Sequence, residues 1–310
     1  NELGNGWMGY GWAVNMPAVG IETRWGSPRY DAALETEMYT LNGELLSPMN
    51  NRSELVARSA EKRFYKRVEG SFSRIIRHGN NPSNYWWEVT EKDGTRSCYG
   101  GRPGTGIVNN AILRDGQNNI AYWALVETRE VGDNFVRYEY TTVEDPGIAG
   151  GTVPGKQLYP SRIFYTGLGT ADGPYSIEFV SDRQLGEPRR SDVMIDGRFG
   201  FKMVNADLLR RVNISLNGQL IRRYEYTYTT GAFFKTLLSS ISEIDDAGEI
   251  FYTHNFDYFD DVNKNNYDPS TDDVAWDVPN DGIKGDIVNP IDGFTSEASI
   301  ISTSKAKSIS

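Results

Sequence analysis

Residues 212–228 read VNISLNGQLIRRYEYTY and hold the clearest structural signal in the chain. Asn217-Gly218 is the dipeptide favoured at the centre of a type I′ turn, because both central residues of that turn have positive φ angles. Apolar residues alternate with polar ones on either side of it: Val212, Ile214 and Leu216 before the turn, and Leu220, Tyr224, Tyr226 and Tyr228 after it. An alternation with period two indicates a half-buried strand. The stretch therefore predicts an antiparallel β-hairpin.

Three further stretches show the same pattern of two alternating segments around a turn. They are residues 85–99 with Asp93-Gly94 at the turn, residues 120–140 with Gly132-Asp133-Asn134, and residues 238–258 with Asp245-Asp246-Ala247-Gly248. No long helical periodicity interrupts them, although residues 31–38 favour a short helix and residues 50–64 fit either a loop or a strand. We predict an all-β protein with few or no helices, whose antiparallel hairpins form a large curved sheet or a sandwich-like packing.

Composition and charge exclude several classes of protein. The 310-residue chain is 38% hydrophobic, enough to bury a core, and its net charge of −10 argues against a nucleic-acid partner. The single cysteine, Cys98, rules out an internal disulfide and a multi-thiolate metal site. The paired arginines at 189–190, 210–211 and 222–223 are expected on solvated strand faces. No run of 18 apolar residues exists, so we expect no direct membrane insertion.

The composition changes near residue 259. Between residues 257 and 292 there are ten Asp against two Lys, with Pro269, Pro279 and Pro290 interrupting regular structure, and a Ser-rich tail follows. Such a segment cannot build a core. We therefore predict a β domain over residues 1–259 and a linker or extended tail over residues 260–310 that leads to a following domain. The start at Asn1, without an initiator Met, fits an internal segment of a longer chain.

One stretch of this tail has the spacing of a calcium-binding loop. Such a loop places oxygen-bearing side chains at positions 1, 3, 5 and 12 and a backbone carbonyl at position 7. The matching residues are Asp261, Asn263, Asn265, Asp272 and, for the carbonyl, Tyr267. Two interpretations stay open, a calcium site and a solvated acidic turn, and no other cofactor is expected.

Two other motifs match enzyme signatures only in part. Gly4-Asn-Gly-Trp-Met-Gly9 has the glycine pattern of dinucleotide-binding loops, but no strand precedes it and no helix follows it. We therefore expect its glycines to allow close backbone packing. Glu35-Thr-Glu37 and Ser302-Thr-Ser304 are similar to elements of ADP-ribosyltransferases, but they occur in the reverse order. Glu35 and Glu37 are expected to be solvated.

Few residues could serve a nucleophilic mechanism. The only histidines are His78 and His254, and no G-x-S-x-G elbow surrounds any serine. His254 shares a predicted strand face with Tyr252 and Phe256, which favours a partly buried, structural imidazole. Cys98 has no neighbouring cation in its predicted hairpin, so we expect an inert thiol. We predict no catalytic residue and no enzyme activity.

An ordered series of short motifs resembles the N-terminal domain shared by the SpvB virulence proteins and the B subunits (TcdB/TcaC-like) of insecticidal toxin complexes. In order, the series is Gly6-Trp-Met-Gly-Tyr-Gly-Trp12, Pro28-Arg-Tyr-Asp31, Tyr39-Thr-Leu-Asn-Gly-Glu-Leu45, Arg63 to Ile75 (which contains Glu69-Gly-Ser-Phe-Ser-Arg-Ile75), Trp87-Glu-Val89, Lys92-Asp-Gly94, Tyr99-Gly100 and Tyr224-Glu-Tyr226. The resemblance covers residues 3–259. Met8 and the Asp- and Asn-rich tail depart from the family pattern. The pentapeptide RYEYT occurs at 137–141 and at 223–227, either as a structural repeat or by chance.

The resemblance implies a structural role. In that family the domain begins a β-sheet shell of tyrosine-rich Rhs-type (YD) repeats that encloses a toxic polypeptide, and a β-propeller docks onto a pore-forming subunit. We therefore expect a secreted bacterial protein that is not catalytic itself. Its expected partners are the rest of its own chain (β-propeller and Rhs shell), a toxin C-component cargo and a pore-forming A-type subunit.

The alternative is an extracellular β-sandwich module that binds carbohydrate or a surface protein. It would display Trp7, Trp12, Trp86 or Trp123 on its surface. Exposed tryptophans favour this module, whereas buried tryptophans favour the shell.

Overall fold

The computed structural model describes residues 4–48 and 55–258. The chain divides into two units, the first made of Asn1–Thr230 with Phe234–Phe256 and the second of Gly231–Phe233 with Asp257–Ser310. All the strands of the described residues lie in the first unit. The predicted domain boundary at residue 259 falls where the described residues end, and it stays a prediction.

Strands dominate the described part of the chain, with 53% of its residues in strands and 4% in helices, which confirms the predicted all-β class. The helical elements are α1 (Asp182–Leu185), η1 (Asn109–Ala111) and η2 (Ala232–Phe234). Seven short strands lie beside the main sheet or at its margins: β1 (Asn5–Gly6), β2 (Gly9–Tyr10), β10 (Gly101–Arg102), β11 (Gly106–Ile107), β12 (Ile112–Arg114), β17 (Met194–Asp196) and β18 (Met203–Asn205). Among the described strands, pairing is antiparallel except for one parallel bridge between β18 and β15 (Gly155–Leu168).

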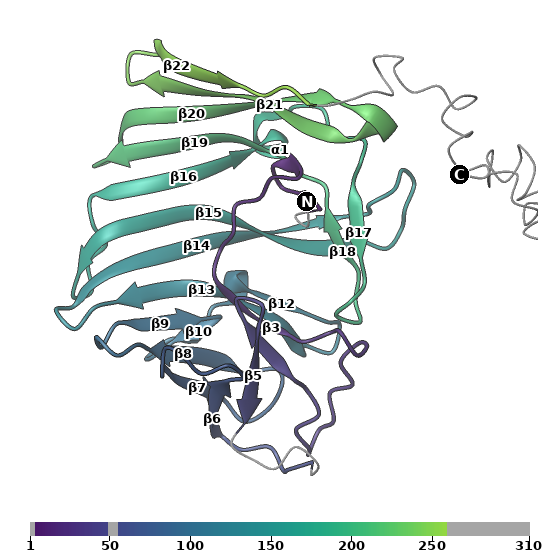
Figure 1. Ribbon diagram of the computed structural model, residues 1–310, viewed down its shortest axis with the longest axis vertical. Helices are drawn as coiled ribbons and strands as arrows, with labels where there is room; N and C mark the ends of the chain where they lie inside the picture. The colour runs from purple at the N-terminus through teal and green to yellow at the C-terminus, as the bar shows by residue number, and fades with distance from the viewer. Residues whose placement is uncertain (1–3, 49–54, 259–310) are drawn as a thin grey trace, which may run out of the picture. The chain divides into compact units, whose positions relative to one another are not determined.

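Eight strands close into a barrel (Figure 1). They are β3 (Ala18–Ile21), β4 (Tyr39–Leu41), β5 (Glu44–Pro48), β6 (Glu61–Lys66), β7 (Arg74–His78), β8 (Trp86–Thr90), β9 (Arg96–Tyr99) and β13 (Ile120–Arg129). Each pairs with the next, and β13 pairs with both β9 and β3, which closes the ring. Closure leaves no free edge within the ring. The hairpin signals in the sequence did not predict this closure.

Aromatic side chains fill the barrel. Trp87 and Trp123 are fully buried, and their rings meet edge to face with centroids 5.9 Å apart. Tyr39 lies 4.8 Å from the Trp87 ring, and Phe64 lies 5.0 Å from the same ring. Tilted and edge-to-face contacts of this kind are preferred by aromatic quadrupoles. The indole nitrogen of Trp123 donates to the backbone carbonyl of Tyr85 at 2.5 Å, so its polar atom is satisfied.

Seven long strands extend the sheet from β13 (Figure 1). In spatial order they are β14 (Asn134–Asp145), β15, β16 (Tyr175–Ser181), β19 (Leu209–Leu216), β20 (Gln219–Thr230), β21 (Thr236–Asp245) and β22 (Ile250–Asn255). One face is apolar and includes Ile177 and Phe179. The opposite face carries cross-strand polar pairs, such as Arg162 with Glu178 at 2.8 Å. This one-sided burial follows from the alternation seen in the sequence.

The four predicted hairpins all form. They are β8–β9, β13–β14, β19–β20 and β21–β22. Asn217 and Gly218 have φ angles of 50° and 78°, as a type I′ turn requires. The two RYEYT copies lie in β14 and β20, the second strands of their hairpins.

An N-terminal strap, residues 5–14, packs on the apolar face of the extended sheet (Figure 1). The Trp7 ring lies 5.2 Å from that of Tyr159, and its backbone carbonyl accepts from Leu209 N at 2.9 Å. Gly9 has a φ of 83°, and a Cβ there would lie 2.6 Å from the carbonyl oxygen of Thr236. Only glycine fits at this position, which confirms the packing role expected for the glycine-rich start.

The predicted helix over residues 31–38 is wrong. The Asp31 carboxylate accepts from the backbone amides of Ala33 and Leu34 at 2.8 and 2.7 Å, and Leu34 forms a β-bridge with Ala57. Local side-chain bonding and tertiary pairing override the helix propensity.

The helix α1 does form, and its capping signal is present in the sequence. Ser181 and Gln184 form a capping box, and Gly186 ends the helix with a φ of 69°.

The prediction that Glu35 and Glu37 are solvated is also wrong. Their side chains are 6% and 1% exposed, because each carboxylate pairs with a buried arginine. Arg77 Nη1 donates to Glu35 Oε2 at 2.6 Å, and Arg58 Nη2 donates to Glu37 Oε1 at 2.8 Å. Burial alone would raise the pKa of Glu35, but the hydrogen bonds and charge of Arg77 outweigh it and hold the pKa below its usual range.

Arg190 also differs from the prediction, since its side chain is fully buried rather than solvated. Its guanidinium donates to Asp192 Oδ1 at 2.8 Å, to the Gly6 carbonyl at 2.7 Å and to the Asn5 side chain. Asp192 also accepts from Thr236 N at 2.7 Å. This hydrogen-bond network around Arg190 and Asp192 connects the strap to the start of β21. The paired arginines at 210–211 and 222–223 instead form partly exposed ion pairs.

We expect Gly218→Ala to destabilise the protein by about 1 kcal/mol, because alanine is strained in the left-handed region. No atom lies within 4 Å of a Cβ built at Gly218, so the cost is conformational. Gly197→Ala is the control, because its surroundings are equally open and its φ lies outside the left-handed region. Urea denaturation measures both free energies of unfolding. Equal losses in the two variants would contradict the turn assignment.

We expect Arg77→Met to destabilise the protein by about 3–5 kcal/mol at pH 7, since Glu35 keeps its charge, loses its closest partner and retains only Arg58 at 3.9 Å. The pKa of the Glu35 carboxyl is lower in the folded than in the unfolded chain. The Arg77–Glu35 pair therefore stabilises the folded protein fully above the unfolded pKa, and this stabilisation is lost as pH falls through the folded pKa. In the variant the carboxyl can protonate, so the deficit relative to the unsubstituted chain shrinks on acidification. Urea titrations at two pH values test this sign. The matched double variant, Arg77→Met with Glu35→Leu, should recover most of the loss.

Candidate functional site

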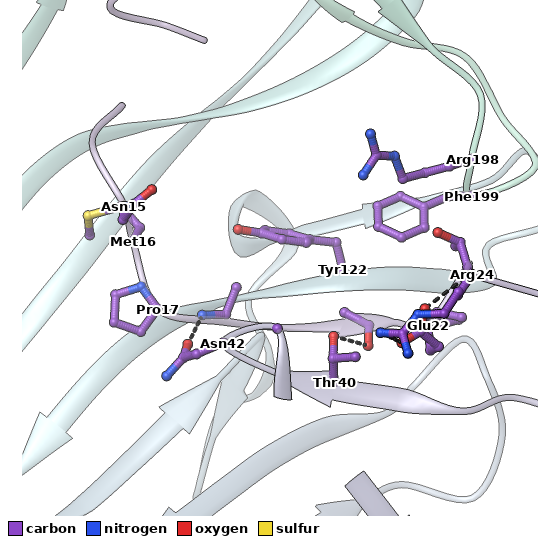
Figure 2. A pocket seen from close by; sticks show the side chains of 15 residues that line it. Asn15, Met16, Pro17, Glu22, Arg24, Thr40, Asn42, Tyr122, Arg198 and Phe199 are labelled. Atoms are coloured by element: carbon purple, nitrogen blue, oxygen red, sulfur yellow. Dashed lines mark hydrogen bonds and ion pairs between the residues drawn. The ribbon is translucent and has the colours of Figure 1, made fainter. Parts of the chain in front are cut away.

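A surface cavity of about 720 Å³ lies against the outside of the barrel (Figure 2). Its floor is formed by β3, β4 and β13, and the loop around Phe199 and the segment 15–17 contribute its sides. Tyr122 lies across the middle of the view, between Met16 and Phe199. The volume falls within the roughly 300–1,000 Å³ typical of small-ligand pockets.

Two local features of the sequence build the floor. Gly20 pairs with Tyr122 across β3 and β13, and the missing side chain leaves space beside the tyrosine ring. Asn42 and Gly43 have φ angles of 51° and 83° and form the two-residue turn between β4 and β5. The Asn42 side-chain oxygen accepts from Ala18 N at 2.9 Å, which fixes the amide at the cavity wall.

The charged groups at the cavity are paired. Glu22 is 10% exposed, and its carboxylate accepts from Arg24 N at 2.7 Å and lies 3.3 Å from the Arg24 guanidinium. Arg198 pairs with Asp196 at 2.5 Å. Burial raises the pKa of Tyr122 to about 12, so its phenol is neutral at physiological pH. The arrangement suits hydrogen bonding and ring contact with a ligand.

The residues considered for catalysis do not converge on this cavity. His78 lies on β7, where its ring stacks on Trp86 with centroids 4.0 Å apart. His254 lies on β22 and is exposed, so the prediction that it is partly buried is wrong. Burial raises the pKa of the Cys98 thiol to about 12, in agreement with the expected inert thiol.

The predicted calcium ligands, Asp261, Asn263, Asn265, Tyr267 and Asp272, lie outside the described residues, as does Ser302-Thr-Ser304. Within residues 4–48 and 55–258, no three His, Cys, Asp or Glu side chains are grouped as a metal site would require. In that same part of the chain, no helix has the length and apolar character needed to span a bilayer.

Of the tryptophans considered for surface binding, none is exposed. Trp7 and Trp123 are buried, and Trp12 and Trp86 are half-buried in packing contacts. The cavity residues Gly20, Asn42 and Tyr122 were not among the predicted site residues. A glycine inside the apolar run Ala-Val-Gly-Ile and the turn dipeptide Asn42-Gly43 were the signals that could have indicated them.

Solved structures share this fold at low sequence identity. The N-terminal domain of effector protein SpvB from Salmonella typhimurium strain LT2 matches with a TM-score of 0.62 and 18% identity, over 82% of this chain and 91% of that domain. A crystal structure of TcdB2-TccC3 matches with a TM-score of 0.63 and 20% identity, over 80% of this chain. The Photorhabdus luminescens Tc holotoxin pore matches with a TM-score of 0.63 and 18% identity, over 81% of this chain. The match spans only 14% of the toxin-complex chain in each of the last two structures.

At the level of sequence, no curated protein matches the chain. A family model does match: that of the Salmonella virulence plasmid 65kDa B protein covers residues 1–166. This match includes the whole barrel and the first two strands of the extended sheet, β14 and most of β15. The resemblance read from the short motifs is thereby confirmed, and the chain belongs to the SpvB family.

Proposed function

We propose that this domain is a non-catalytic wall segment of a secreted bacterial toxin complex, in which a β-sheet shell encloses a toxic polypeptide. The barrel anchors one end of the extended sheet, and the sheet supplies the wall. Further strands of the same polypeptide, of Rhs type, would continue it. A β-propeller of that polypeptide would dock on the pore-forming A-type subunit, and the cargo would be the toxin C-component.

The observation that carries this proposal is the outer edge of β22. Within residues 4–48 and 55–258, β22 pairs with β21 alone. Its side chains Ile250, Phe251 and Tyr252 are 64%, 80% and 50% exposed. Proteins that end a sheet in solvent usually protect the edge with charge, proline or a bulge. A one-residue register shift against β21 places a bulge at Phe251, but β22 contains no proline and no Asp, Glu, Lys or Arg. An apolar edge strand is instead suited to accept another strand.

The polar groups of the barrel support a structural role. Glu35 and Glu37 are each neutralised by a buried arginine, so neither carboxylate is available as a general acid or base. The aromatic side chains are used in packing, as the buried Trp87 and Trp123 illustrate. Both features serve the packing of the barrel, and neither provides a free acid, base or nucleophile.

Protection of a cargo from protease tests the proposed function. The complete polypeptide that carries this domain is co-expressed with an epitope-tagged toxin C-component and treated with proteinase K. We expect the tagged cargo to survive while added, unenclosed cargo is digested. Digestion of both at the same rate would contradict the shell.

The edge strand gives a second prediction on the 310-residue chain alone. We expect the chain to self-associate at high concentration through β22, and we expect Phe251→Lys to weaken this association by roughly tenfold or more, because a charge at an edge opposes strand addition. Val68→Lys is the matched control, since Val68 is 77% exposed just after β6. Sedimentation velocity measures both. The edge assignment fails if the two lysine variants behave alike.

A further inference from the structure

Gly20, which has no side chain, lines the cavity of Figure 2. The nearest atoms to a Cβ built on Gly20 are Thr40 Oγ1 and Tyr122 Cδ2, both at 3.8 Å, which is ordinary contact. The backbone at Gly20 is not in the left-handed region, so neither conformation nor crowding demands glycine. What the glycine does provide is free space beside the ring of Tyr122. A glycine inside a strand is a common mark of a ligand or backbone that approaches closely.

Two aromatic rings from distant parts of the chain border this space. Tyr122 comes from β13, and Phe199 comes from the loop between β17 and β18. The Tyr122 ring also borders a smaller cavity of about 120 Å³ on the side of Met16. Both rings are partly accessible, so they can contact the apolar face of a bound molecule.

The polar groups around the rings include both donors and acceptors. Asn42 uses its side-chain oxygen on Ala18 N, which leaves its NH₂ group to donate. Thr40 and Tyr122 contribute hydroxyl groups, Glu22 contributes an acceptor and Arg24 contributes donors. A ligand rich in hydroxyl groups can satisfy this mixture, because each hydroxyl both donates and accepts.

The charge balance excludes an anion as the preferred ligand. Arg24 is paired with Glu22, and Arg198 is paired with Asp196, so neither guanidinium adds a surplus positive charge. Phosphate and carboxylate ligands are bound by arginines that are free to form paired hydrogen bonds. The whole chain also carries a net charge of −10, which repels anions. We infer that this cavity binds a neutral saccharide, with the sugar ring against Tyr122 and Phe199 and its hydroxyls on Asn42, Thr40, Glu22 and Arg24.

Saturation-transfer NMR and calorimetry on the 310-residue chain test the site. The probes are maltotriose, cellotriose and N,N′,N″-triacetylchitotriose, with glucose 6-phosphate as the charged comparison. We expect at least one neutral trisaccharide to bind and the phosphorylated sugar to bind more weakly. Gly20→Leu fills the space beside Tyr122 and should weaken binding at least tenfold, whereas Gly20→Ala, which the 3.8 Å clearance accommodates, should change it little.

A second variant keeps the test decisive if Gly20→Leu fails to fold. Arg24 is 61% exposed, so Arg24→Ala should leave thermal unfolding unchanged and weaken saccharide binding about fivefold by removing a hydrogen-bond donor. Three results would each overturn the inference: no neutral trisaccharide binds, glucose 6-phosphate binds more tightly, or a folded Gly20→Leu or Arg24→Ala variant keeps full affinity. None of them bears on the β22 edge, so the proposed wall function is judged separately.

Discussion

The structure depends on one strand, β13, which has partners along both edges and in both halves. Its first half lies between β12 and β3, and its second half lies between β9 and β14. The strand thus closes the barrel and starts the extended sheet at the same time. At its centre Trp123 is fully buried, and a Cβ on Gly100 would collide with its indole ring. A strand buried on both faces leaves little freedom of register, because a slip by one residue would exchange the two faces.

Strand β13 positions both features to which we assign a function, the outer cavity and the extended sheet that ends at β22. Trp123 and Leu125 face the barrel interior, while Tyr122 lies on the other face and lines the outer cavity. The second half of β13 begins the run of strands that ends at β22. The barrel therefore supports both features: the cavity lies against its outer surface, and the extended sheet continues from β13. Rigid elements of this kind position a site more reliably than loops do.

Local features could be predicted from the sequence, and long-range ones could not. Turn dipeptides and alternation identified the four hairpins, because a turn such as Asn217-Gly218 and its flanking strands lie within about 20 residues of each other. Barrel closure depends on β13 meeting β3, with Tyr122 opposite Gly20, and no local pattern encodes that contact. The burial of Glu35 likewise depends on Arg77, which is 42 positions away. The cavity was missed for the same reason, since its walls come from separated segments.

The N-terminal strap has a consequence for the way the chain acquires its structure. The backbone carbonyl of Trp7 accepts a hydrogen bond from Leu209, about 200 residues further along the chain. Arg190 binds Asn5 and Gly6. Its partner Asp192 in turn accepts a hydrogen bond from Thr236, which is synthesised later still. During synthesis the strap therefore has no place to dock until nearly the whole unit has been made. Contacts of such long sequence separation slow folding, and they expose the strap's tryptophans in the meantime. An emerging chain of this kind is a natural client for a chaperone that shields apolar segments.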